Sequence, residues 1–561
     1  MWRGIRSHFG TILLVSALVS VVLGTWGFLS FAEAGGLPVA LYRSVQLFYW
    51  NYFPWNTSVE ATLPWSLEVA RWLAPLTMLG AIFQVAVAVF QRQWNRFRAR
   101  RLTGHAVICG AGRKGTVLAR DLEERGRQVV LIESDPDRAE ALEAEGFLVV
   151  CGDATKASVL AQAGTAKAAQ VAVTTSDDEH NLIISMAAAE FGMPSVHAHG
   201  NRASLCDLYW RHRAQDAPAA SGAPVRVFSE ARNIARQTIR DFAPESGEGE
   251  VHVVLPGLCC LGRAMAFEYA LLGHFTDDRR VHLHLVGPGA SRDLAMLKRR
   301  FPGITQCMDL DAMDLVDEEH FSRQVAALLA STPGRFTIFP ALDEGNRGYS
   351  RTLELLEQTS DRSDLRILLT APSDSPLRSM VSRHRRLNDR IGFLPQPEDV
   401  CGYEAVIGES LDRTARTIHE KWIRETQAQI AEARAAGNEA LARNLEGKAT
   451  FRQWEELNEE QKGASRSQAD HIPFKVRAAG WEPGTVTKAL WDSLTPPQIE
   501  RLSRMEHKRW EAYYWMTGWT FAPQRNDAAK QHPNLVAYDL LDEPTKDYDR
   551  SVVLHVGDFL E

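Results

Sequence analysis

The stretch HAVICGAGRKGTVLARDL, residues 105–122, joins a short apolar run to three closely spaced glycines and a segment of mixed polarity. The apolar run predicts a buried strand, and Gly110, Gly112 and Gly115 predict a turn that leads into a helix. In such a unit the first glycine permits the tight turn, the second lets the backbone approach a pyrophosphate, and the third allows close packing of helix on strand. The positive end of the helix dipole faces the same place. The stretch therefore predicts a dinucleotide site in a parallel α/β sheet.

A second strand makes this prediction more specific. The segment RQVVLIESD, residues 127–135, ends its apolar run at Glu133, whose carboxylate can accept hydrogen bonds from both ribose hydroxyls. A carboxylate repels a 2′-phosphate, and Ser134 offers no compensating cation. The sequence therefore favours NAD(H) or another adenine nucleotide, ADP or ATP, over NADP.

Further polar residues follow the next two predicted strands. The segment FLVVCGDAT leads to Asp153, and QVAVTTSDDEHNL leads to Thr175. Strand ends at that edge line the crevice in which open parallel sheets bind ligands. In the glycine turn, Arg113 either contacts the ligand or lies in a solvated loop, whereas Lys114 is expected in the loop.

Two apolar stretches precede this unit. The segment 9–31 has no charged residue over 23 positions, roughly 34 Å of helix, and the segment 72–90 has a similar character. Arginines flank the outer ends of both stretches, at Arg3, Arg6, Arg92, Arg96, Arg98, Arg100 and Arg101. The positive-inside rule then predicts two transmembrane helices with both termini in the cytoplasm. A cleaved signal peptide is the alternative for the first stretch, because AEA at 32–34 suits a peptidase.

The connection between the two stretches has its own pattern. Its segment 37–56, LPVALYRSVQLFYWNYFPWN, spaces Val45 and several aromatic residues by three and four positions, which predicts an amphipathic helix too short to cross a bilayer. This helix resembles the pore helix of simple two-span potassium channels. The TVGYG filter, whose carbonyls replace the water shell of the ion, does not follow it. The aromatics either belong to a pore or sit at the lipid interface, so conduction and the ion stay open.

Length and composition set further bounds. The 561 residues suffice for several domains, which we expect at 1–102, 103–245, 246–400 and 401–561. The net charge is −7 and no domain of the chain is basic, so nucleic acid is not an expected partner. The seven cysteines form no CxxC pair, so the sequence predicts no metal site.

Four segments in a fixed order resemble the RCK (TrkA-N) domain family, the cytoplasmic regulators of potassium channels and transporters. The segments are CGAGRKG, VVLIESDPDR, VVCGDAT and VAVTTSDDEHNL. The resemblance covers about residues 104–240. It implies a Rossmann fold that binds NAD(H) or another adenine nucleotide and transmits its occupancy to a membrane pore. It gives ligand-binding roles to Gly110, Gly112, Arg113, Gly115, Glu133 and Asp153.

The segment VHVVLPGLCCLGRAMAFEYA, residues 251–270, repeats the strand, glycine turn and helix. Gly257 and Gly262 match the first and third glycines of the first copy, but Cys259 stands where the second does. A side chain there would crowd a pyrophosphate. The next strand carries Gly287 in place of the ribose carboxylate. These changes predict a second Rossmann-like domain that has lost ordinary dinucleotide binding and has a structural role or a different ligand.

The C-terminal segment 502–553 resembles the RyR domain, the repeated helical module of ryanodine receptors that also occurs in bacterial proteins. The matching marks include EHKRW at 506–510 and HP at 532–533, and with IHEKW upstream the match covers about 405–561. Ala522 departs from the family, which often has glycine after the aromatic residue. The charged, alanine-rich segment 423–448 is expected to be an exposed helical insertion.

Aromatic and cationic residues gather in this C-terminal segment. Rings near cations suit an adenine nucleotide or a nucleotide-derived messenger, since the ring stacks on the base and the cation binds phosphate. In the alternative interpretation the tryptophans form the core of a small helical domain, and His532 with Pro533 forms a turn. The candidate ligand residues are Trp510, Trp519, Arg525, Lys530 and His532.

These features lead to three functional hypotheses. The first is a ligand-gated, potassium-channel-like protein of the bacterial inner membrane, which as a two-span pore requires a homo-oligomer, a tetramer or a dimer of dimers. The second is a non-conducting membrane-anchored sensor or effector. The third is an NAD-dependent oxidoreductase. His180 lies in the right region for the third hypothesis, but no acid/base set accompanies it, so we expect no enzyme and no catalytic residue.

Overall fold

The computed structural model describes residues 2–30, 36–50, 63–192, 195–201, 225–242, 249–276, 279–317, 320–342, 346–359, 362 and 364–560. The chain forms two compact units. One comprises Met1–Gly110 with Gln128–Ala169, and the other comprises Ala111–Arg127 with Gln170–Glu561.

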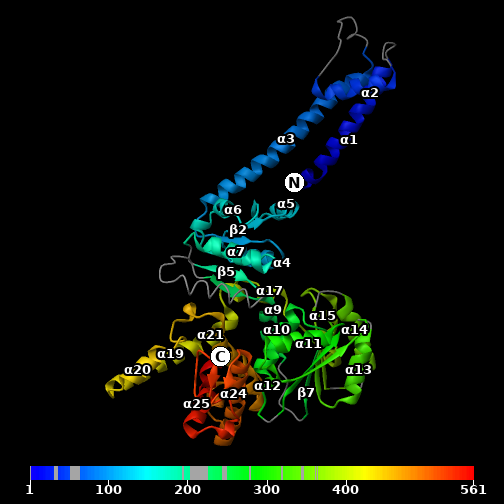
Figure 1. Ribbon diagram of the computed structural model, residues 1–561. Coiled ribbons are helices and arrows are strands. Elements are labelled where there is room, and N and C mark those ends of the chain that lie inside the picture. Colours follow the sequence, from blue (N-terminus) through cyan, green and yellow to red (C-terminus); the bar gives the residue numbers. More distant parts are fainter. Residues whose placement is uncertain are drawn as a thin grey trace. The chain divides into compact units, whose positions relative to one another are not determined.

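The first unit begins with a helical hairpin, in which α1 and α3 lie side by side (Figure 1). A Cβ atom on Gly27 would lie 2.6 Å from the Leu67 Cβ, so glycine is required for the close approach of the two helices. The hydroxyls of Thr25 and Ser44 lie 3.1 Å apart and link α1 to α2. The helices of the hairpin are α1 (Trp2–Leu29), α2 (Leu37–Gln46), η1 (Leu47–Tyr49) and α3 (Trp65–Arg101).

Two helices among the described residues are long and apolar enough to cross a membrane, over Gly10–Leu29 and Trp65–Ala86. The second stretch starts earlier than the expected 72–90, because the helix already begins at Trp65. The arginine-rich segment that follows the second stretch continues α3 to Arg101. The predicted short helix forms as α2, whereas AEA at 32–34 and most of the segment after η1 lie outside the described residues.

The C-terminal end of α3 packs on β3 and α6 of the first unit. There Asn95 Nδ2 donates a hydrogen bond of 2.9 Å to Glu143 Oε1, and Lys167 Nζ donates one of 3.4 Å to the Arg100 carbonyl. Strands β1 to β3 are parallel, with Ala106 opposite Val129 and Val130 opposite Leu148. The elements are β1 (Ala106–Cys109), β2 (Val129–Glu133), α5 (Pro136–Glu145), β3 (Leu148–Cys151), α6 (Ala157–Gln162) and η3 (Thr165–Lys167).

The second unit supplies the remaining elements of this α/β fold. Its strands β4, β5 and β6 pair in parallel, and the whole six-stranded sheet has the order β3-β2-β1-β4-β5-β6. This order is that of a doubly wound, dinucleotide-binding fold. The elements are α4 (Arg113–Glu124), β4 (Gln170–Val173), α7 (Asp178–Ala189), β5 (Val196–His199), β6 (Val225–Phe228) and α9 (Glu230–Asp241).

A second six-stranded parallel sheet follows in the same unit, in the order β12-β11-β10-β7-β8-β9. Its strands run through the same sequence of neighbours as those of the first sheet, so the predicted second Rossmann-like fold is confirmed. The strands are β7 (Val251–Leu255), β8 (Val281–Gly287), β9 (Asp309–Asp314), β10 (Arg335–Ile338), β11 (Leu365–Leu369) and β12 (Ile391–Phe393). The principal helices are α10 (Cys260–Leu272), α11 (Ala290–Arg300), α13 (Phe321–Ser331), α14 (Asn346–Gln358) and α15 (Pro376–Arg383).

Short helices lead from this sheet to a mainly helical C-terminal region built around the buried Trp454 and Trp491. The expected exposed insertion forms α19 and α20, which are not polar all round, because Ile430 and Leu445 pack together in a small core of their own. The elements are α17 (Pro397–Val400), α18 (Tyr403–Val406), η5 (Ser410–Asp412), α19 (Arg413–Ala435), α20 (Glu439–Glu446), α21 (Glu459–Asp470), α22 (Ile472–Ala478), α23 (Lys488–Trp491), α24 (Pro496–Met516), β13 (Thr520–Phe521), β14 (Gln531–His532) and α25 (Glu543–Leu554).

Candidate functional site

The carboxyl ends of β1, β2 and β3 bring three of the predicted residues to one sheet edge in the first unit. Gly110 follows β1 with a φ of 90°, a conformation that favours glycine, and its amide donates 2.9 Å to the Ile132 carbonyl. Glu133 ends β2 and is 9% exposed. Asp153 follows β3, and the intervening Gly152 amide donates 2.8 Å to the Glu133 carbonyl.

The carboxylate of Glu133 is held by the turn that follows it. Its Oε1 accepts hydrogen bonds from the backbone amides of Ser134, at 2.7 Å, and Asp135, at 3.0 Å. Arg138 Nε lies 3.9 Å from Oε2. These contacts fix the position of the carboxylate at the strand end. Arg138, in the first turn of α5, was not singled out from the sequence, although it follows the carboxylate by only five residues.

The carboxylate of Asp153 also orders its own turn. Its Oδ1 accepts 3.0 Å from the Thr155 amide and 2.7 Å from the Thr155 hydroxyl. The same edge of the first unit therefore presents a glycine turn and two oriented carboxylates.

The N-terminus of α4, in the second unit, carries the other glycines. Gly112 is the N-cap residue, and a Cβ built on it would meet no described atom within 4 Å. Gly115 is buried one turn into the helix. Arg113 Nη2 lies 3.7 Å and Lys114 Nζ 3.5 Å from the carboxylate of Glu230, at the start of α9, which sequence analysis did not single out. The open space at Gly112 fits the close approach of a phosphate to the helix N-terminus.

Thr175 follows β4 and is tied to α7. Its hydroxyl lies 2.6 Å from Asn181 Oδ1, which also accepts 2.9 Å from the Thr175 amide. His180 is exposed on the first turn of α7, and its backbone amide donates to Asp177 Oδ1. Thr175 is thus a fixed strand-end residue.

The corresponding turn of the second sheet also begins with a glycine at positive φ, but different side chains surround it. Gly257 has a φ of 147°, and a Cβ on Gly262 would lie 2.3 Å from the Gly257 carbonyl oxygen, which matches the expected turn and helix packing. The amide of Leu258, in the turn, donates 3.2 Å to Asp293 Oδ2 of α11. In this copy a backbone amide of the turn therefore already donates its hydrogen bond to a carboxylate of the chain itself.

The C-terminal region brings four of its five predicted residues together. The ring of Trp510, on α24, lies 4.9 Å from that of His532, and the Trp519 ring lies 6.2 Å from it. The guanidinium of Arg525 lies 5.9 Å from the Trp519 ring, and its Nη1 lies 3.4 Å from His532 Nε2. Tyr514 completes this aromatic cluster, with its ring 4.4 Å from Trp510. Tyr514 was missed, although its spacing of four residues from Trp510 on a helix was a usable signal.

Charge in this aromatic cluster is distributed unevenly. Lys530 Nζ donates 2.7 Å to Glu460 and 2.9 Å to the Thr517 carbonyl, so its ammonium group is engaged by α21 and the end of α24. Burial, reinforced by the cation of Arg525, lowers the pKa of His532 to about 4, so this imidazole is neutral at pH 7.

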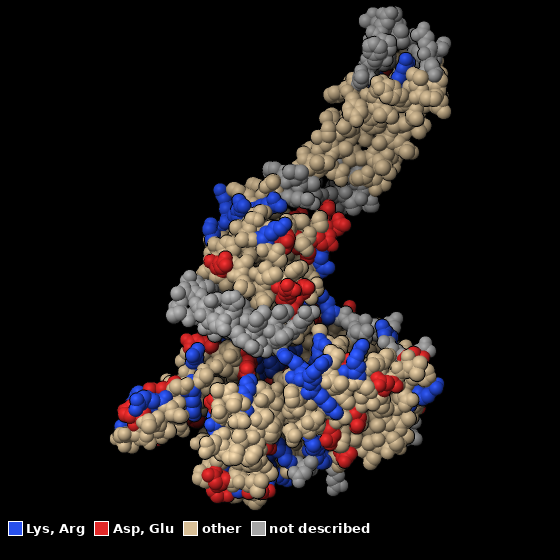
Figure 2. Space-filling model, in the orientation of Figure 1, with Lys and Arg blue, Asp and Glu red and all other residues tan. Residues whose placement is uncertain are grey.

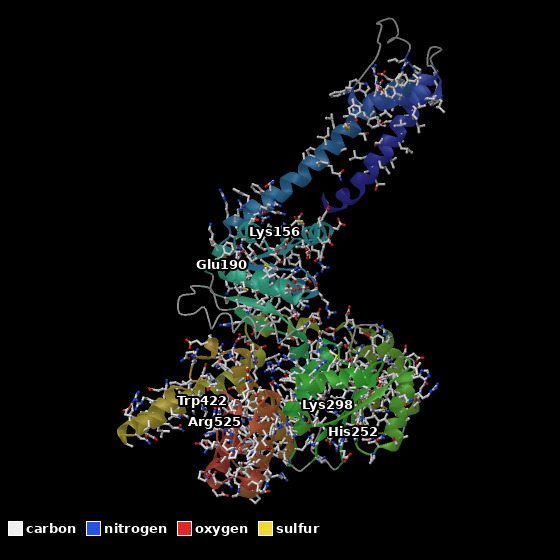
Figure 3. The ribbon with its side chains drawn as sticks, in the orientation of Figure 1. Lys156, Glu190, His252, Lys298, Trp422 and Arg525 are labelled. Carbon is white, nitrogen blue, oxygen red and sulfur yellow. The ribbon has the colours of Figure 1, made fainter. Side chains whose placement is uncertain are left out.

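The tryptophans of the C-terminal region differ in burial, which bears on whether each belongs to the core or could contact a ligand. Trp454 and Trp491 are fully buried and form the core, whereas Trp510 and Trp519 are half-buried. The Asn534 amide donates 3.1 Å to His532 Nδ1, so this histidine also forms the expected turn. Figure 3 labels Arg525 and also Trp422 of α19, whose ring lies 5.9 Å from Lys448 Nζ.

Two segments of the chain match models of known protein families. Residues 106–217 match the model of the TrkA-N domain family, and residues 493–560 match that of the RyR domain family. No curated protein matches the chain.

Solved structures similar to this chain include three of GsuK. A mutant of GsuK is 18% identical, with 71% of this chain and 96% of that chain covered and a TM-score of 0.37. The GsuK channel bound to NAD is 16% identical, with 72% and 83% covered and a TM-score of 0.38. GsuK bound to ADP is 18% identical, with 64% and 93% covered and a TM-score of 0.29. On its family matches, this chain carries a TrkA-N domain and a RyR domain.

Proposed function

We propose that this chain is a nucleotide-regulated, channel-like protein of the bacterial inner membrane that passes a monovalent cation such as potassium. The observation that carries the proposal is the continuity of α3. One helix runs from Trp65 to Arg101, its first part is apolar enough to span a bilayer, and its last turns pack on β3 and α6. Strand β3 leads directly to Asp153 and pairs with the strand that ends at Glu133. A ligand at this sheet edge therefore acts on the strands that hold the end of the helix.

The surface of the helical hairpin supports a lipid environment. Only 22% of each of the two apolar stretches is buried. Large apolar side chains are exposed along both helices, and Figure 2 shows the hairpin almost free of blue and red. A continuous apolar surface of this kind is costly in water and stable in lipid. Examples of the exposed side chains are Leu14, Leu18, Val22, Leu76, Ile82 and Phe83.

The regulatory ligand is NAD(H) or another adenine nucleotide. Gly110 supplies the left-handed turn, Gly112 leaves space at the start of α4, and Glu133 offers a fixed carboxylate for the ribose. The TrkA-N match covers all three residues. The residues that would hold the nucleotide are Gly110, Gly112, Arg113, Gly115, Glu133, Asp153 and Thr175.

The RyR domain supplies a second input. Its cluster of Trp510, Trp519, Arg525 and His532 offers half-buried ring faces beside a guanidinium, which suits a nucleotide or nucleotide-derived messenger. Gating requires that each ligand bind the open and closed states with different affinity. The pore requires several copies of the two-helix hairpin in a closed ring, a tetramer or a dimer of dimers.

Flux through reconstituted protein tests this proposal. The full-length chain in potassium-loaded liposomes is expected to release potassium at a rate that changes with NADH, NAD or ADP. In the Glu133→Ala variant this ligand dependence is expected to disappear, whereas the exposed Glu140→Ala control on α5 should keep it. Equal flux with and without every nucleotide would contradict the proposal.

The second candidate function is a non-conducting, membrane-anchored sensor or effector. The absence of TVGYG after the α2 segment favours it, because no residue of the sequence supplies the usual potassium filter. Nucleotide binding without ion flux in the same liposomes would select this function. We propose that neither form is an enzyme, and turnover of NADH with a small carbonyl compound would overturn that statement.

A further inference from the structure

A large pocket lies in the second unit, and Leu258 and Asp293 of the second glycine turn are among its lining residues. Its volume is about 610 Å³, within the ordinary range for small-molecule sites. It is lined from the end of β5, β6, α9, α10, α11, the α18–η5 segment and α21, so both Rossmann-like folds and the C-terminal region contribute to it. None of the residues predicted to bind a nucleotide at the glycine turn or in the RyR domain lines it.

A buried network of ion pairs, here called the floor, lines the pocket through Arg236, Asp412, Glu459 and Arg466. Arg236 Nη1 lies 2.7 Å from Asp412 and its Nε lies 2.6 Å from Asp470. Arg466 pairs with Asp412 and, at 2.5 Å, with Glu459. The neighbouring guanidinium groups hold the pKa of Asp412 well below its usual range against the effect of burial. These five charged side chains satisfy one another and give the floor a rigid, ordered shape.

The pocket walls carry further cations. Arg226 lies 3.4 Å from Glu409, and Arg232 lies 2.8 Å from Glu268. Arg263 on α10 and Arg300 at the end of α11 form no ion pair with any carboxylate that the structure describes; Arg263 Nη2 contacts only the Cys260 sulfur, at 3.5 Å, among its polar partners. Figure 2 shows blue side chains gathered over α10 and α11. The wall therefore has guanidinium groups to offer an anion.

Aromatic rings line the pocket beside these cations. The rings of Phe267 and Phe301 lie 5.1 Å apart and are tilted to each other, and Phe228 contributes a third ring from β6. All three are only half-buried, so their faces reach the pocket. A phosphate that carries a flat ring can bind where both kinds of group surround one cavity. Its ring stacks on the half-buried aromatic rings, and its phosphate accepts hydrogen bonds from the exposed guanidinium groups.

We propose that this pocket binds a small organic phosphate with a flat aromatic ring, of the size of a mononucleotide. The phosphate lies against Arg263 and Arg300, and the ring lies against Phe267 and Phe301. A pocket of this volume matches a small molecule in size. Because its walls come from three regions of the chain, occupancy joins α9, α10 and α21 more firmly. This site is separate from the glycine-turn nucleotide site and does not depend on it.

Calorimetric titration of the full-length, detergent-purified chain with AMP tests the assignment. The proposal predicts that AMP binding survives in the Glu133→Ala variant, which alters the glycine-turn site. It predicts a loss of at least tenfold in AMP affinity in the Arg263→Gln/Arg300→Gln double variant. The matched control is Lys298→Gln/Arg299→Gln, which removes the same charge from the exposed end of α11 outside the pocket; Figure 3 labels Lys298.

The outcomes separate this site from the proposed function. AMP binding that is lost in the double variant and kept in its control supports the pocket, whether or not NADH binds elsewhere. AMP affinity that is equal in the double variant and the control, or absent in Glu133→Ala, overturns it. Inorganic phosphate that binds as tightly as AMP also overturns it, because the rings would then contribute nothing. Loss of NADH binding alone concerns only the glycine-turn site.

Discussion

The turn after β1 and the turn after β7 place their helix caps alike. Gly112 has φ −64° and ψ −173°, and Cys259 has φ −61° and ψ −178°. The cysteine thus fits the backbone of the turn without strain, and the two sheets share one strand order. The copies differ in what surrounds that backbone. The comparison teaches that a fold and a turn can be kept while the ligand chemistry is replaced residue by residue.

Besides Cys259, two features distinguish the second copy from the first. At the end of the second strand, Glu133 corresponds to Gly287, and a Cβ on Gly287 would lie 2.5 Å from the Pro256 carbonyl oxygen. The strand end of the second copy is therefore closed by backbone where the first has a carboxylate. In the turn, Asp293 already accepts the hydrogen bond of the Leu258 amide. A phosphate entering there would have to displace a carboxylate of the chain.

The largest effect is expected from Glu133→Ala. Hydrogen bonds to a charged group are worth about 1.5–3 kcal/mol, so NADH affinity should fall roughly 10- to 100-fold. Titration calorimetry of the full-length chain measures this, with Glu140→Ala as the control. An unchanged affinity would mean that the ribose does not bind at this strand end. The presence of Glu133 in the first copy and its absence from the second would then not explain a difference in nucleotide binding.

Gly112→Cys imposes the second copy's residue on the first. Because Cys259 adopts the same backbone angles, the variant should fold with an unchanged melting temperature. Its Cβ and sulfur enter the space open at Gly112, so NADH affinity should fall about tenfold, or ~1.4 kcal/mol. The NADH affinity of Gly112→Ala, whose side chain is smaller, should lie between that of Gly112→Cys and that of the native protein. Full affinity in Gly112→Cys would show that no phosphate approaches this position.

The local sequence was sufficient to predict the paired glycine turns. Strands β1, β2, β7 and β8 are short, mainly apolar runs, and each was expected where it lies. A glycine turn follows β1 and β7, whereas β2 and β8 end at Glu133 and Gly287. Strand β9 was not expected, because DLDAMD is an edge strand whose alternate acids face solvent. Its frequent acidic residues are typical of a loop, and only the pairing with β8 identifies the segment as a strand.

Long-range contacts could not be predicted in the same way. Asp293 reaches the glycine turn across 35 positions of sequence, and Glu230 meets Arg113 from another helix. The arginine-lined pocket draws its residues from elements that lie far apart in the sequence, and apart from the second glycine turn none of them was singled out by a motif. Such sites depend on how the elements pack, and no periodicity or spacing in the sequence encodes that packing directly.

A histidine cluster marks the second sheet and predicts its acid sensitivity. His252 Nδ1 lies 3.0 Å from His284 Nε2. Burial, then the neighbouring His252, lowers the pKa of His284 to about 4, while Asp311 opposes the shift. Since the folded-state pKa lies below the unfolded value near 6.5, the unfolded chain binds more protons, and stability falls as pH drops from 6.5 toward 4.

Thermal melting between pH 7 and pH 4 checks this prediction. The apparent melting temperature should decline by several degrees, at ~2–4 °C per kcal/mol lost. His284→Asn should flatten the decline. The exposed His180→Asn, on α7, is the control and should leave the decline unchanged. A decline that is equally steep in both variants would show that the cluster is not its source.

Asp293→Ala tests whether the carboxylate in the second turn stabilises the fold. Loss of its bond to the Leu258 amide should cost about 0.5–1.5 kcal/mol of the free energy of unfolding. The melting temperature of the full-length chain should therefore decrease slightly, with NADH binding unaffected. No decrease would mean that the carboxylate fills the turn without supporting it.

Cys259→Gly should have the smallest effect and is the sharpest test of the comparison. It restores the glycine pattern of the first copy and removes only a weak cap, the 3.5 Å contact of the Gly262 amide with the Cys259 sulfur. Asp293 still occupies the turn amide, and Gly287 still offers no carboxylate, so calorimetry should detect no second NADH site. If a second site did appear, the Cβ of one cysteine would have been the sole barrier to binding. The carboxylate at the strand end would then be dispensable in the first copy as well, which the Glu133→Ala titration would independently reveal.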